Sequence, residues 1–194
     1  MKQVFVFTGF YYIYMEEKMF RGVIFDMDGV IINSEAQIKE KLQEYPQYLI
    51  DTKGYQEVPG IKNLIKSLYQ NGIRLAITSS APELEISAVI ETLGIAKYFT
   101  KLVSGKTVSN SKPAPDIYKK ALAELELNSE ECIVIEDSGN GIKAGIAAGM
   151  PVIGFYNPDC GNQDLSQASM VVEGFEEVDY QFVKRVYERA HKLP

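Results

Sequence analysis

Short apolar segments alternate with amphipathic segments along most of the chain, and this alternation restricts the fold more than any other feature. Strands that alternate with helices form βαβ units, in which parallel strands make a sheet and the helices cover its faces. The sequence therefore predicts an α/β fold, a three-layer Rossmann-like parallel sheet with helices on both faces. The expected strands are residues 21–25, 73–78, 100–104, 131–136, 151–155 and 169–172, and the expected helices are residues 34–44, 60–71, 82–94, 114–126, 140–149 and 175–190.

Length and composition exclude several classes of protein. A chain of 194 residues allows one sizeable domain with a small appendage. The net charge of -6 argues against nucleic acid and anionic membrane surfaces as partners. Two cysteines, Cys132 and Cys160, are too few for a disulfide framework or a cysteine zinc site. We therefore expect a cytoplasmic globular protein, and Cys132, within the apolar run of residues 132–135, is interpreted as a buried and inert thiol.

The first 18 residues are apolar and aromatic but do not fit a signal peptide or a membrane span. Lys2 is the only positive charge at the start, and Thr8 and Gly9 interrupt the apolar core. An added edge strand, or a dispensable extension ahead of a domain that begins at Met19, is the favoured interpretation. Residues 1–18 are thus an N-terminal extension of unknown role.

Two aspartates lie at the end of the first expected strand of this domain. Asp26 and Asp28 follow the apolar run of residues 23–25, and Gly29 marks a turn. In parallel α/β sheets the carboxyl ends of the strands form the ligand-binding edge. Two carboxylates this close call for a cation or a shared proton, and Mg²⁺ prefers such oxygen ligands. Asp26 could attack phosphorus and Asp28 could act as general acid and base, although a plain Asp-Gly turn remains an alternative.

Polar groups also follow three other expected strands or lie in the loops after them. Ser79 and Ser80 precede a helix and could bind an anion, or Ser79 and Ser80 could merely supply its N-cap. Lys112 lies in a proline-rich loop, where its ammonium group could meet a phosphoryl oxygen or an aspartate. Single lysines, however, are usually solvated surface charges.

Glu136 and Asp137 end the fourth expected strand and precede a glycine-rich turn into a helix. These two carboxylates could complete an acidic metal pocket. The alternative is an acidic N-cap, in which Asp137 caps the helix and Glu136 is exposed. Because phosphate monoesters hydrolyse very slowly, an enzyme must stabilise the transition state mainly by neutralising charge. Jointly, the polar groups at these positions favour phosphoryl transfer.

In order and character these segments resemble the haloacid dehalogenase-like hydrolase superfamily, and within it the β-phosphoglucomutase-like and phosphoglycolate-phosphatase-like enzymes. The resemblance extends from Met19 to about Phe155 and is carried by residues 25–30, 78–80, 111–118 and 135–145. It implies a phosphoaspartate at Asp26, with Asp28 as general acid and base. The second aspartate points to phosphoryl transfer, because the dehalogenating branch lacks it.

The resemblance also implies the remaining site residues. Ser79 and Lys112 would be catalytic, and the substrate phosphate would meet Gly29, Ser79, Ser80 and Lys112. Mg²⁺ would be held by Asp26, the backbone carbonyl of Asp28, and Asp137, with Glu136 supporting it directly or through water.

The sequence departs from these relatives in the segment that forms the helical cap over the site. Residues 33–57 leave room for two short helices, so the expected organisation is a core of residues 19–32 and 58–194 with a truncated cap insert at 33–57. Asn33 stands where relatives often have an aspartate. The leading hypothesis is a Mg²⁺-dependent phosphatase for a small phosphorylated metabolite. A sugar phosphomutase and a catalytically weak binding protein are the alternatives, and the substrate and the oligomeric state stay open.

Overall fold

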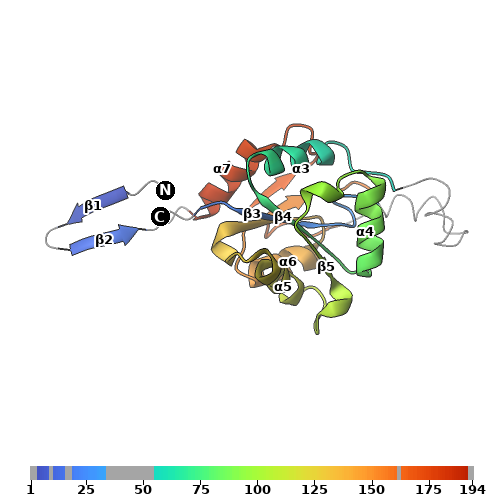
Figure 1. The fold of residues 1–194 in the computed structure, drawn as a ribbon, viewed down its shortest axis with the longest axis horizontal. Coiled ribbons are helices and arrows are strands. Elements are labelled where there is room, and N and C mark those ends of the chain that lie inside the picture. The colour runs from blue at the N-terminus through green and yellow to red at the C-terminus, as the bar shows by residue number, and fades with distance from the viewer. Residues whose placement is uncertain (1–3, 9–10, 16–18, 34–54, 161–162, 192–194) are drawn as a thin grey trace, which may run out of the picture.

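The computed structural model places most of the chain in one α/β body (Figure 1). It describes the side chains of residues 19–33, 55–160 and 163–191, and the backbone of residues 4–8 and 11–15. The expected helix at 34–44 and nearly all of the expected cap insert lie outside the described residues. Among the described helices, none combines the length and apolar character needed to cross a lipid bilayer.

Two short strands near the N-terminus form a sheet of their own. β1 (Val4–Thr8) pairs antiparallel with β2 (Tyr11–Met15). The two strands pair with each other and are not part of the larger sheet. The favoured interpretation of an added edge strand therefore does not describe this segment.

A six-stranded parallel sheet forms the centre of the body. Its order is β5-β4-β3-β6-β7-β8, so the first strand of the core lies in the middle. All five residues of β3 and all five of β6 are buried, which explains why each reads as a continuous apolar run. The bounds are β3 Gly22–Asp26, β4 Arg74–Ser79, β5 Lys101–Ser104, β6 Cys132–Glu136, β7 Val152–Phe155 and β8 Met170–Val172.

Helices cover both faces of this sheet, as Figure 1 shows for α3 and α7 on one side and α5 and α6 on the other. Their bounds are α3 Ile61–Gln70, α4 Glu83–Thr92, α5 Asp116–Leu125, α6 Gly139–Ala147 and α7 Tyr180–His191. One apolar core joins α3, α4 and α7 to the sheet, and a second joins α5 and α6 to it. The predicted three-layer parallel fold is confirmed.

The last helix begins later than the sequence predicts. We expected a helix over residues 175–190, but α7 starts at Tyr180, where the Asp179 side chain accepts a hydrogen bond of 2.8 Å from the Phe182 N–H. Phe175 lies in the turn before it and is fully buried in the core. Its apolar side chain therefore reflects core packing and not helical periodicity.

The chain segments on either side of residues 34–54 pair with each other beside the end of β3. Ile32 forms an antiparallel bridge with Glu57, the Asn33 N–H donates to the Gln56 carbonyl at 2.9 Å, and the Val58 N–H donates to the Ile31 carbonyl at 3.0 Å. The residues that flank the segment 34–54 are thus adjacent to each other, next to the end of β3.

Candidate active site

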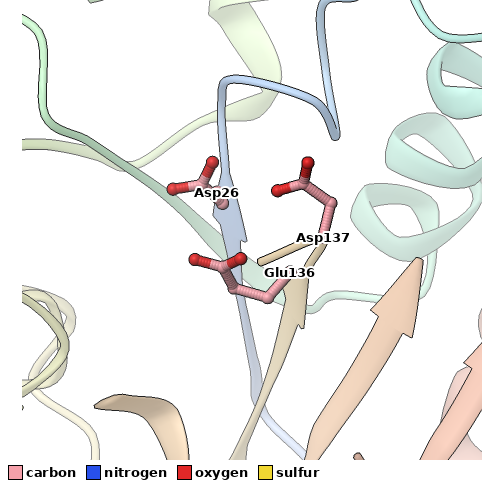
Figure 2. Close-up of side chains that lie close together, drawn as sticks. All are labelled: Asp26, Glu136 and Asp137. Atoms are coloured by element: carbon pink, nitrogen blue, oxygen red, sulfur yellow. The ribbon is translucent and has the colours of Figure 1, made fainter. Parts of the chain in front are cut away.

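Three carboxylates meet at the carboxyl edge of the sheet (Figure 2). Asp26 ends β3, Glu136 ends β6, and Asp137 follows it. One oxygen from each of them lies within 4.8 Å of the others, and all three residues are buried. The strand register accounts for this arrangement, because β3 and β6 are parallel neighbours with Phe25 opposite Ile135.

Lys112 connects two of these carboxylates. Its Nζ donates a hydrogen bond to Oδ1 of Asp26 and another, of 2.6 Å, to Oε1 of Glu136. The Tyr118 hydroxyl, from the first turns of α5, donates to the same Glu136 oxygen at 3.1 Å. Lys112 is therefore not a solvated surface lysine. Its ammonium group is fixed against the strand tips.

The second oxygen of Glu136 is used at the start of α6. Oε2 accepts hydrogen bonds from the backbone N–H of Ser138 at 2.8 Å and from its hydroxyl at 3.0 Å. Ser138 in turn caps α6, because its Oγ accepts from the Gly141 N–H at 3.0 Å. The acidic N-cap alternative is therefore wrong: Ser138 is the cap, and Glu136 is 1% exposed.

The buried Asp137 carboxylate is only partly compensated by the groups around it, which include Lys112. Its Oδ2 accepts a hydrogen bond of 3.1 Å from Nε2 of Gln163. Burial, reinforced by the charge of Glu136, raises the pKa of Asp137 to about 7. Gly29 borders the same carboxylate, and a Cβ at this position would lie 1.9 Å from Oδ2 of Asp137. Gly29 is therefore required for this close approach, as well as for its positive φ of 83°.

Both members of the Asp26–Lys112 pair have a raised pKa. Burial raises the pKa of Asp26 well above its ordinary value, and the opposing charge of Lys112 only partly offsets this. Burial acts to lower the pKa of Lys112, but the charges around it, that of Asp26 foremost, outweigh burial and hold this pKa well above its usual range. Lys112 is thus a permanent cation beside the candidate nucleophile.

The turn after β4 brings the serines to Asp28. The Ser79 hydroxyl donates a hydrogen bond of 2.9 Å to Oδ2 of Asp28 and accepts one of 3.0 Å from the Ala81 N–H. Ser79 is buried, whereas Ser80 is exposed. The N-cap interpretation of these serines is wrong, because Pro82 precedes the first residue of α4. Glu83 and Glu85 in the first turn already complement the positive end of this helix.

Sequence reasoning missed three residues that hold the site together: Tyr118, Gln163 and Asn157. Asn157 is 2% exposed, and its Nδ2 donates to the Gly29 carbonyl at 3.0 Å and to Oδ1 of Asn33 at 3.4 Å. Asn157 comes two residues after β7, so the rule that polar residues at strand ends mark the site could have found it. Tyr118 and Gln163 carry no such signal.

The residues present fit a divalent cation with a preference for oxygen ligands. One oxygen of Asp26 and one of Asp137 lie within 4.8 Å of each other, and the absence of a side chain at Gly29 leaves room for the Asp137 carboxylate there. The raised pKa of Asp137 reflects a buried negative charge that a cation would neutralise. Mg²⁺ binds one or two carboxylates together with waters and phosphate oxygens. Glu136 has both oxygens engaged by Lys112, Tyr118 and Ser138, so its support of a metal would be indirect.

Two curated relatives with similar sequences are phosphatases by name. The chain is 31% identical over 132 residues to a phosphorylated carbohydrates phosphatase of Thermotoga maritima, an alignment that covers 64% of this chain and 61% of that protein. It is 26% identical over 151 residues to a phosphoglycolate phosphatase of Salmonella paratyphi A, covering 76% of this chain and 60% of the relative. The chain thus spans about 60% of the length of these relatives.

The fold and the family are shown by two further comparisons. The crystal structure of CbbY from Rhodobacter sphaeroides in complex with phosphate superposes with a TM-score of 0.72 at 21% identity, covering 86% of this chain and 100% of that one. Residues 35–155, more than half of the chain, match the family model of haloacid dehalogenase-like hydrolases. The chain therefore belongs to the haloacid dehalogenase-like hydrolase family.

Proposed function

We propose that this protein is a Mg²⁺-dependent phosphatase that hydrolyses a small phosphate monoester through an aspartyl-phosphate at Asp26. The observation that carries the proposal is the contact of Lys112 with both Asp26 and Glu136 at the sheet edge where Asp137 also lies. This arrangement combines a nucleophile with the positive charge that a phosphoryl group requires. The names of the curated relatives support the same reaction class.

The reaction begins with attack on phosphorus. A carboxylate oxygen of Asp26 forms a bond to phosphorus while the bond between phosphorus and the ester oxygen breaks. Asp28 gives its proton to the departing oxygen, so the alcohol leaves neutral. Water then attacks the aspartyl-phosphate, Asp28 takes the proton of that water, and the release of inorganic phosphate restores the Asp26 carboxylate.

The phosphoryl oxygens meet cationic and N–H groups throughout these steps. The Lys112 ammonium group lies beside Asp26, and Ser79 with the backbone of the turn at Ser80 faces the same space near Asp28. These groups stabilise the negative charge on the equatorial oxygens of the transition state. Glu136 acts on the reaction through Lys112, whose position it fixes.

Asp26, the backbone carbonyl of Asp28, and Asp137 would hold the Mg²⁺, with Glu136 outside its direct ligands. When bound, the metal neutralises phosphoryl charge and offsets the repulsion among the carboxylates. The protein's own part is to keep these oxygens close together, which Gly29 permits and Gln163 supports through Asp137.

The test is phosphate release from p-nitrophenyl phosphate. Wild type should release phosphate with Mg²⁺ and lose activity in EDTA, and Asp26→Asn should be inactive. Glu124→Gln removes a carboxylate from the surface of α5 and serves as the matched control. Within the part of the chain that the structure describes, the one ion pair of Glu124 is with Lys120, at 3.8 Å. Equal rates for wild type and Asp26→Asn would refute the proposal.

A further inference from the structure

An open hollow adjoins Lys112 on the β5 side of the site. Its polar lining consists of Ser80, Gly105, Lys106, Ser111 and Lys112. Ser80 and Lys112 are also the residues expected to meet the transferred phosphate. The hollow is therefore continuous with the place where a phosphoryl group would lie, and a group attached to that phosphate could extend into it.

The hollow is built from the short 3-10 helix Gly105–Thr107 that follows β5. Ser104 connects this helix to the turn after β4. Its hydroxyl donates a hydrogen bond to the Ala81 carbonyl at 2.5 Å and accepts one from the Lys106 N–H at 3.1 Å. A Cβ on Gly105 would lie 3.3 Å from both the carbonyl oxygen of Ser79 and Cα of Ser80. Gly105 therefore lets the backbone that carries Lys106 pack directly against the turn that carries the serines.

The polar lining is positively charged. None of the described residues that line the hollow is a carboxylate, and two of them are lysines. Lys112 is engaged by Asp26 and Glu136. Lys106 is exposed, and its ammonium group has no carboxylate at ion-pair distance within the part of the chain that the structure describes. Lys106 is thus a cation beside the candidate active site that remains available to a ligand.

We propose that Lys106 binds a second anionic group of the substrate, a carboxylate or a second phosphate, within this hollow. The inference rests on the proposed phosphatase function and narrows its substrate class to small phosphate esters that carry a second negative charge. The core loop after β5 would then select the substrate through the Lys106 side chain. Val108 and Ile117 contribute an apolar part of the lining, which suits a short carbon skeleton between the two anions.

Three esters with the same two-carbon skeleton test this assignment: phosphoglycolate, ethylene glycol bisphosphate and ethylene glycol monophosphate. The measured quantity is the ratio of kcat/KM for each doubly anionic ester to that for the monophosphate. Lys106→Met should lower this ratio about fivefold, since one exposed charge contact is removed. The effect should shrink as salt is raised from low to about 0.5 M, because exposed charges are screened.

Lys101→Met is the matched control. Lys101 is an exposed lysine at the opposite end of β5, outside the lining of the hollow, and its replacement changes the net charge equally. This variant should keep the wild-type ratios. A loss in Lys106→Met confined to phosphoglycolate assigns a carboxylate to the hollow, and a loss confined to the bisphosphate assigns a phosphate. Unchanged ratios for both esters in Lys106→Met, or equal losses in Lys101→Met, overturn the inference.

Failure of the underlying function gives a different result. If wild type hydrolyses none of the three esters, the phosphatase proposal fails, and calorimetry with Asp26→Asn in Mg²⁺ then decides the hollow separately. Binding of phosphoglycolate or the bisphosphate that is tighter than that of the monophosphate, and that weakens when Lys106→Met is added, supports the anion site. Equal affinities for all three esters, with or without Lys106→Met, overturn it.

Discussion

The ammonium nitrogen of Lys112 lies 2.6 Å from Oε1 of Glu136, at a site where Glu136 is 1% exposed. A buried carboxylate this close to a lysine fixes both the position and the charge of that lysine. Glu136 is therefore a positioning residue for Lys112, while the Tyr118 hydroxyl holds the same oxygen from α5.

Glu136→Gln should lower kcat at least tenfold and leave KM less affected. The amide keeps the shape of the side chain but removes the charge that holds Lys112, so the loss falls on the transition state. Steady-state kinetics with p-nitrophenyl phosphate measures this. Glu136→Ala should in addition destabilise the fold by about 2–4 kcal/mol, because Lys112 and Tyr118 lose a buried partner. A Glu136→Gln enzyme with the wild-type kcat would contradict the positioning role.

Asp137→Asn should stabilise the metal-free protein at alkaline pH. The pKa of Asp137 in the folded protein is about 7, above its ordinary value of 3.8. As the pH rises, the unfolded chain therefore loses the proton of the Asp137 carboxyl group before the folded protein does. Wild-type stability therefore falls as pH rises from about 4 to 7 and levels off above it, by on the order of 2–4 kcal/mol. Asn has no such ionisation.

Thermal unfolding in EDTA at pH 5 and pH 8 measures this difference. The Tm gain of Asp137→Asn over wild type should be larger at pH 8. Adding Mg²⁺ at pH 8 should raise the Tm of wild type and have little effect on the variant, since the variant lacks one proposed ligand. A Tm difference independent of pH would show that Asp137 ionises normally in the fold.

Asn33→Asp should destabilise the loop after β3. The Asn33 amide donates a hydrogen bond of 2.5 Å to Oδ2 of Asp159, so an aspartate at 33 would face a like charge and lose the donor. We expect a cost of about 1–3 kcal/mol. This contact favours a neutral amide over a carboxylate at position 33.

Urea denaturation of four proteins tests that coupling: wild type, Asn33→Asp, Asp159→Asn and the double variant. The double variant restores a donor opposite an acceptor and should recover most of the stability that Asn33→Asp loses. Additive losses in the double variant would mean that the two side chains do not interact.

Cys132 should be unreactive in the folded protein. Burial raises its pKa to about 12, and its side chain is fully buried beside Gly22. A thiol reagent at pH 8 should therefore leave Cys132 unmodified in the native state and modify it in guanidinium chloride. Rapid modification of Cys132 in the native protein, detected by mass spectrometry, would contradict the packing of β6 against this end of β3.

The sequence predicts the sheet well and the side-chain contacts less well. Each core strand lies within one residue of its expected bounds, because buried parallel strands are continuous apolar runs. The predicted start of the last helix, at residue 175, was wrong because Phe175 lies in the turn before α7 and is buried there. The expected helices at 82–94 and 140–149 begin within one residue of α4 and α6, but their N-cap residues are Pro82 and Ser138 and not the residues that the sequence suggested.

The candidate site shows the same division. The rule of polar residues at strand ends correctly brings Asp26, Glu136 and Asp137 together, since it needs only the parallel sheet. It could not predict that Lys112 would contact Glu136, because that contact depends on how α5 and the loop before it pack against β6. The contact of Gln163 with Asp137 could not be predicted for the same reason, because Gln163 lies in a loop 26 residues further along the chain.

The most direct measurement of the central claim is the capture of a covalent phosphoryl group on Asp26. Wild type is mixed with a ³²P-labelled phosphate ester and Mg²⁺, quenched in acid within one turnover, and digested for peptide mapping. We expect label on the peptide that contains Asp26, removal of the label by hydroxylamine, and no label in Asp26→Asn. An active wild-type enzyme that never carries label on this peptide, or Asp26→Asn that releases phosphate at the wild-type rate, would contradict that claim.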